Sequence, residues 1–112
     1  MAYDEELAGR IRSIIPGDVD RLSERKMFGG LAFLVGGNMA IAASGQGGIL
    51  VRVDPASSDE LVAGTPATVA VMRGREMPGW LRVATSDVAV DDALGAWVSR
   101  GVGYASSLPP KP

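Results

Sequence analysis

Cysteine and histidine are both absent from this chain of 112 residues. Without cysteine there is no disulfide framework, no thiolate nucleophile and no cysteine-ligated zinc site. Without histidine the chain lacks the usual general base near neutral pH and the commonest metal ligand in proteins. These absences exclude much of enzyme chemistry, so we expect a protein that is not an enzyme and that uses no cofactor or metal.

Acidic side chains and glycine clusters offer little to replace that chemistry. Asp4-Glu5-Glu6 and Asp91-Asp92 precede segments of helical periodicity, where carboxylates favour the positive end of a helix dipole. We prefer that interpretation to a metal site. The cluster Gly45-Gln46-Gly47-Gly48 leads into a strand-like segment, whereas a phosphate loop leads into a helix, so it predicts a turn.

Charge and hydropathy favour a soluble protein without a basic stripe. Lysine and arginine total 11 against 13 acidic residues, a net charge of −2, which argues against strong nonspecific binding of nucleic acid. No apolar run reaches the roughly 18 residues that a membrane span needs. The first residues are acidic, unlike a signal peptide. We therefore expect a cytoplasmic protein that does not bind membranes.

The length and the 46% hydrophobic content suit one domain over residues 1–112. In the first half, Leu7, Ile11 and Ile14 recur at helical spacing, and Pro16-Gly17 ends that helix. The polar segment 18–23 predicts a loop. The apolar runs that follow, separated by glycine-containing turns, predict strands at 25–29, 31–35, 39–43 and 49–53.

The second half predicts a helix, two strands and a final helix. Asp54-Pro55 suits the start of a short helix that ends near Gly64. Strands are expected at 68–72 and 80–84, with a polar link at 73–79, and the last helix is expected over 91–107. The predicted order is α-β-β-β-β-α-β-β-α. It indicates an α+β two-layer sandwich in which helices cover an antiparallel sheet of five to six strands.

Several segments together resemble a known family. They are Arg25–Phe33, Gly37–Met39, Leu50–Val53, Met77–Trp80, Ala96–Gly101 and Ser107–Lys111. Their order and spacing resemble the N-terminal domain of the TfoX/Sxy competence regulators, over about residues 3 to 111. The resemblance implies a two-layer fold with an antiparallel sheet, similar to secretion-chaperone-like folds.

The same resemblance implies a role in regulating transcription, since the competence regulators act with a transcription factor. Two departures qualify it. Pro78 stands where many relatives carry lysine, which removes a cation and a backbone donor from that segment. The regulators also carry a C-terminal helical domain, and we expect this chain to be a stand-alone domain of the N-terminal type. Family membership indicates fold more strongly than function.

Three basic residues are candidate partner contacts. Arg25 and Lys26 begin the first strand and suit a phosphate or an acidic surface; the alternative is solvated charges that discourage edge pairing. Because side chains alternate across a strand, only one of the two belongs to a given patch. Arg52 shares a face with Leu50, and its planar group suits a carboxylate or phosphate. The alternative is a solvent-facing arginine or one paired with an internal acid.

Aromatic residues complete the candidate set. Trp80 shares strand parity with Arg82, so the two form a candidate aromatic–cation surface; the alternative is a tryptophan at the rim of the core. Phe28 is the candidate apolar contact beside the first two cations. The methionines are interpreted as packing residues, although methionine also serves adaptable binding surfaces. They are Met27, Met39, Met72 and Met77.

Three functions remain open. We favour a non-enzymatic protein-interaction module that uses the exposed face or an edge of the sheet, with self-association as a further expectation. The second is a nucleic-acid accessory protein whose basic patch would comprise Arg25, Lys26, Arg73, Arg75 and Arg82. The third is a small-molecule binder, which a concave pocket lined by Arg52 and a carboxylate would favour.

Overall fold

Six antiparallel strands form one sheet in the computed structural model, which describes residues 3–19, 21–27 and 29–110. The strands lie in the order β1-β2-β3-β4-β6-β5. They are β1 (Leu22–Met27), β2 (Gly30–Val35), β3 (Asn38–Ala43), β4 (Ile49–Arg52), β5 (Thr68–Met72) and β6 (Arg75–Val83). The helices are α1 (Glu5–Ile14), α2 (Ser58–Gly64) and α3 (Asp91–Ser107), and short 3-10 turns span Pro55–Ser57 and Thr85–Val88. The expected α+β class and the expected order of elements are confirmed.

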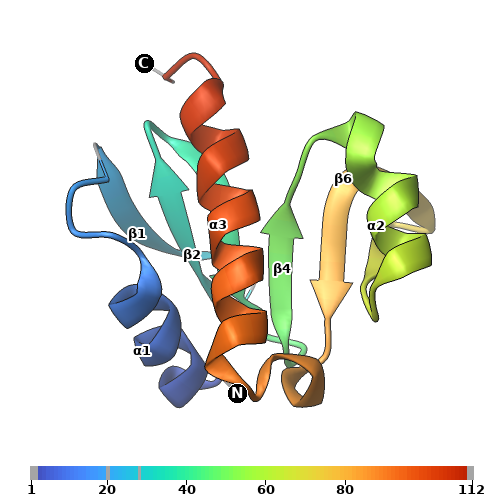
Figure 1. Cartoon of the computed structure of the whole chain (residues 1–112), viewed down its shortest axis with the longest axis horizontal. Coiled ribbons are helices and arrows are strands. Elements are labelled where there is room, and N and C mark those ends of the chain that lie inside the picture. Colours follow the sequence, from blue (N-terminus) through green and yellow to red (C-terminus); the bar gives the residue numbers. More distant parts are fainter. Residues whose placement is uncertain (1–2, 20, 28, 111–112) are drawn as a thin grey trace.

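Helices α1 and α3 lie side by side on one face of the sheet, and α2 lies beside β6 (Figure 1). The core fills the space between this face and the helices. Phe33, Ile41 and Val51 pack there from adjacent strands, together with Leu94 and Val98 of α3, and all five are buried. Each such side chain contributes about 1.5–3 kcal/mol when it leaves water, so this layer fixes which face of every strand turns inward.

A bulge in the ladder between β2 and β3 lies where α3 packs closely on the sheet. Phe33 pairs with Ile41 and Leu34 pairs with Met39, which leaves Ala40 without a direct partner in the register. Ala40 and Ile41 therefore both belong to the helix-side core. Gly101 of α3 packs against the backbone of Ala40, at a distance that an added Cβ would not permit.

Strand β1 begins earlier than the sequence predicted. Residues 18–23 were expected to form a loop, but Leu22 and Ser23 already belong to the strand, where they pair with Val35 and Leu34. The prediction was wrong because β1 is an edge strand with mostly exposed side chains. Its hydrogen bonds to β2 hold it in place, and an apolar pattern does not mark such a strand.

The prediction of a polar link over residues 73–79 was also wrong, because β6 begins at Arg75. A two-residue turn, Arg73-Gly74, joins β5 to β6, and both residues have positive φ, 54° and 75°. Pro78 is tolerated within β6 because the register shifts there. Val69 pairs with Leu81 and Val71 with Glu76, so residues 77–80 bulge opposite the single residue between those two valines.

Candidate binding face

The sheet side away from α1 and α3 carries a second apolar cluster, and we call this side the open face. The described residues of the cluster all come from strands. They are Ala32, Leu34, Met39, Ala42, Leu50 and Ala70, with Met27, Met72 and Trp80 packed against them. Met27 belongs to one edge strand and Met72 to the other, yet both contact the same cluster. The sheet therefore curves toward its open face. This curvature buries Leu50, although no helix residue is among the described members of the cluster.

A hollow of about 420 Å³ lies on the open face. Its walls include Met27 near the end of β1, Met39 in β3 and Met72 in β5, with Leu50 of β4 among them. Two arginines also line it, Arg73 at the β5–β6 turn and Arg82 in β6. No acidic residue is among the described residues that line it. The site is thus an apolar depression with cations on its border.

Arg82 is held in a defined position within this hollow. It lies in β6 opposite Leu50 of β4 on one side and opposite Thr68 of β5 on the other. Its side chain is half-buried, and Nη1 donates a hydrogen bond to Oγ of Ser44 at 3.0 Å. That bond uses one of the five N–H donors of the guanidinium group. The remaining donors are the polar groups that Arg82 can offer to a ligand.

The strand register brings further cations to the same face. Arg25 pairs with Ala32 and Arg75 pairs with Met72, and residues directly opposite one another project to the same side of a sheet. Lys26 pairs with Leu31, whose side chain belongs to the helix-side core. The predicted separation of Arg25 from Lys26 therefore follows from the register, and only Arg25 joins the open face.

The side chains of the acidic strand residues project to the helix side of the sheet. Glu24 pairs with Phe33 of the helix-side core, and Glu76 follows Arg75 in β6, so strand alternation places both on the side opposite Arg25 and Arg75. The other acidic residues that the structure describes lie in helices and connecting segments. Among the described strand residues, the open face thus carries arginines and no carboxylate, although the chain as a whole is acidic.

Glu24 is engaged by α1. Arg12 donates to its carboxylate through Nε at 2.6 Å and through Nη2 at 2.8 Å. The hydrogen bond holds the pKa of Glu24 below its ordinary value and raises the pKa of Arg12. This bidentate pair links the edge strand to the helix layer, and it keeps a negative charge away from the open face.

Arg52 and Trp80 form a separate contact at the other end of β4. The two residues are direct partners in the register. The guanidinium carbon of Arg52 lies 5.0 Å from the centre of the Trp80 ring and 5.7 Å from that of Tyr104 in α3. Arg52 therefore occupies the space between two aromatic rings and does not line the hollow described above.

A comparison with protein-family models identifies the family of the chain. The family model described as the TfoX N-terminal domain matches residues 16–105. The chain belongs to the TfoX N-terminal domain family. No curated protein and no solved structure matches it. The match confirms the resemblance inferred from the sequence, and it spans all six strands of this TfoX N-terminal domain.

Three of the six predicted contact residues of this TfoX N-terminal domain share the open face, namely Arg25, Trp80 and Arg82. The side chain of Arg52, at the end of β4, reaches Tyr104 of α3 on the helix side. Lys26 projects to the opposite side, and Phe28 lies outside the described residues. Sequence reasoning did not identify Arg73 and the methionines as parts of one hollow. The one sequence feature that could have indicated the hollow is the occurrence of methionines at strand positions, and this feature also fits packing in a core.

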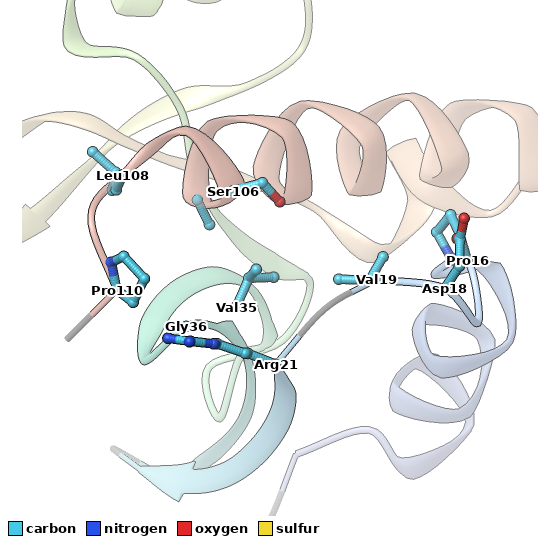
Figure 2. Close-up of a pocket in the computed structure, with 10 residues that line it drawn as sticks. Pro16, Asp18, Val19, Arg21, Val35, Gly36, Ser106, Leu108 and Pro110 are labelled. Carbon is cyan, nitrogen blue, oxygen red and sulfur yellow. The ribbon is translucent and has the colours of Figure 1, made fainter. Parts of the chain in front are cut away.

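A second cleft, of about 520 Å³, lies at the end of α3 (Figure 2). Figure 2 shows Leu108 and Pro110 on one side and Val19 and Asp18 toward the other, with Val35 between them. Its charged residues, Asp18 and Arg21, have opposite signs and exposed side chains. The cleft therefore lacks the single-sign charge that distinguishes the open face of this TfoX N-terminal domain.

Proposed function

We propose that this TfoX N-terminal domain is a non-enzymatic interaction module that binds a protein partner through its open face. The observation that supports this proposal is the combination of an apolar centre with arginines alone among the charged strand residues of that face. Interfaces are enriched in aromatic, methionine and arginine side chains and have an apolar buried core, whereas lysine and acidic residues are depleted from them. A partner with matching chemistry presents an apolar segment flanked by acidic residues.

The family supplies the broader context of the proposal. Membership of the TfoX N-terminal domain family suggests a cytoplasmic regulator that acts on transcription or competence through its partner. The open face would then be the surface that recognises that partner. Arg25 at one edge and Arg75 near the other would pair with its acidic residues, which favours rapid and specific association.

Binding of nucleic acid is the second candidate, because the register gathers Arg25, Arg75 and Arg82 on one face. Two features favour a protein instead. The ring of Trp80 already contacts Arg52, so it is not a free stacking platform. The centre of the face is formed by methionine, leucine and alanine side chains, which match an apolar segment better than a phosphate backbone.

Arg25 and Lys26 offer a matched pair of variants for the test. Both side chains are exposed and adjacent in β1, but they project to opposite faces. Arg25→Glu and Lys26→Glu make the same change of net charge. We expect Arg25→Glu to abolish capture of the partner from the native lysate after nuclease treatment, and Lys26→Glu to preserve it. Equal capture by the two variants would contradict docking on the open face.

The same assay separates the alternatives. Material that disappears after nuclease treatment, with affinity that falls steeply as salt rises, would identify nucleic acid as the ligand. Self-association is checked by sedimentation of the purified chain. A dimer that Arg25→Glu dissociates and Lys26→Glu retains would identify a second copy of the chain as the occupant of the face.

A further inference from the structure

The hollow on the open face has the size of a small-molecule site. Its volume of about 420 Å³ lies within the range of roughly 300–1,000 Å³ that is usual for such sites. Residues from both edges of the sheet border it, Met27 from β1 and Met72 from β5. The turn between β3 and β4 borders it as well, through Ser44 and Gln46. The curvature of the sheet thus encloses a space that a flat sheet would leave open.

The walls of the hollow favour an aliphatic chain. Met27, Met39 and Met72 are unbranched and flexible, so their side chains can adjust to the shape of a flexible ligand. Leu50 and Ala42 add apolar surface without a polar group that a ligand would have to satisfy. A linear hydrocarbon chain would therefore find apolar contacts along its length.

The charged border favours a carboxylate at the end of that chain. Arg82 is oriented by its bond to Ser44, and its planar group pairs with carboxylates through two parallel hydrogen bonds. Arg73 adds a second cation at the β5–β6 turn. No described lining residue supplies a compensating negative charge. A monoanion is preferred to a phosphate dianion because burying the larger charge beside apolar walls costs more.

We propose that the hollow is a binding site for a small aliphatic carboxylate, with its chain among the three methionines and its carboxylate at Arg82 and Arg73. The proposal concerns a small molecule and does not require the protein partner. The arginines proposed for the partner, Arg25 and Arg75, do not line the hollow. Both ligands would contact the same methionines and would therefore compete, but the variants that test the two proposals differ.

Methionine methyl groups provide a direct readout of binding. We would titrate the full chain, labelled with ¹³C at the methionine methyls, with decanoate below its micelle concentration. We expect the resonances of Met27, Met39 and Met72 to shift, while Met77, which does not line the hollow, remains unchanged. Decyltrimethylammonium has the same chain with the opposite charge, so it should cause much smaller shifts.

Two arginine variants test the charged end. Arg73→Asn suits the positive φ of that position and removes the cation, and Arg75→Asn makes the same replacement two residues away, outside the hollow. We expect Arg73→Asn to weaken decanoate binding by about tenfold, the factor that corresponds to 1.4 kcal/mol for a charge-assisted hydrogen bond. Arg75→Asn should leave the affinity unchanged. Arg82→Gln should weaken binding at least as much as Arg73→Asn.

Three results would overturn the inference. One is the absence of decanoate-dependent shifts at the three methionines of the hollow. Another is equal binding of decanoate and decyltrimethylammonium, which would leave the arginines without a role. The third is an equal loss of affinity in Arg73→Asn and Arg75→Asn. Thermal unfolding of each variant, measured first, establishes that a loss of binding is not a loss of fold.

Discussion

Gly101 and Gly103 lie on the same helix, and replacement by alanine should stabilise the fold at Gly103 but not at Gly101. Gly101 is buried where α3 meets β3, and an added Cβ would overlap the carbonyl oxygen of Ala40. The same Cβ would lie 3.3 Å from a methyl group of Val51. Gly103 is exposed, and an added Cβ there would meet nothing within 4 Å. Both positions are helical, so the pair differs mainly in this contact.

The expected magnitude follows from two opposing contributions. Alanine is better than glycine by about 0.8–1.0 kcal/mol in a helix interior, and this gain applies at both positions. Overpacking against a backbone carbonyl costs about 1–3 kcal/mol, and this cost applies to Gly101 alone. Gly103→Ala should therefore stabilise the fold by about 0.8–1.0 kcal/mol. The free energies of unfolding of the two variants should differ by about 1–3 kcal/mol.

Urea titration followed by circular dichroism measures this difference. Small proteins lose about 1–3 kcal/mol of stability per molar urea, so the two midpoints should differ by about 1 M. The near-ultraviolet signal of the aromatic residues, among them Trp97, which is buried in the core, reports whether the native packing survives in each variant. A midpoint for Gly101→Ala at or above that of Gly103→Ala would refute the close approach of α3 to β3.

Three further predictions test other contacts. Arg12 lowers the pKa of Glu24 in the folded state, so the contribution of Glu24 is complete above its unfolded pKa of about 4.3 and is lost as pH falls through the folded value. The difference in free energy of unfolding between the native chain and Glu24→Gln should therefore shrink in acid. Urea titrations at several pH values measure this difference, and a value that does not change with pH would contradict the prediction. A double-mutant cycle of Arg52→Met and Tyr104→Leu should give a coupling energy of about 0.5–1 kcal/mol, and zero coupling would exclude the contact. Gly79→Ala should destabilise by about 1–2 kcal/mol in thermal unfolding, because Gly79 has a φ of +87°; unchanged stability would argue against that backbone conformation.

Apolar periodicity predicted the buried elements well. The last helix was expected over 91–107, and α3 spans Asp91–Ser107. Strands β2 and β3 are buried along their whole lengths and carry uninterrupted apolar runs, so their positions were predictable within a residue. Glycine at 36 and 37 marked the turn between them, and both residues have positive φ. In these elements the local sequence and the tertiary environment impose the same conformation.

The edge strand and the bulged strand were harder to predict because their stability comes from partners. β1 consists of polar and charged residues that gain order by hydrogen bonding to β2. β6 contains Pro78 and Gly79, which usually mark a loop. Here the bulge opposite β5 accommodates both residues. Neither arrangement can be inferred from side-chain pattern alone, since each depends on a strand elsewhere in the chain.

In the candidate site, too, features set by local sequence were predictable, and features set by contacts between distant strands were not. Strand alternation predicted that Arg25 and Lys26 separate and that Trp80 and Arg82 share a face, and the register agrees with both predictions. The hollow itself requires Met27 and Met72, from opposite edges of the sheet, to border one space. Curvature of a six-stranded sheet produces that proximity, and no short sequence motif encodes it.

The distribution of charge over the two faces changes how the net charge should be interpreted. A net charge of −2 argued against a basic surface when it was averaged over the chain. The fold instead directs the two acidic strand residues, Glu24 and Glu76, toward the helix side and leaves arginines on the open face. Net charge therefore does not discriminate between an acidic protein partner and nucleic acid here. The apolar centre of the face supports the proposed protein partner, because a protein segment can bury apolar side chains against the methionines and Leu50, whereas a phosphate backbone cannot.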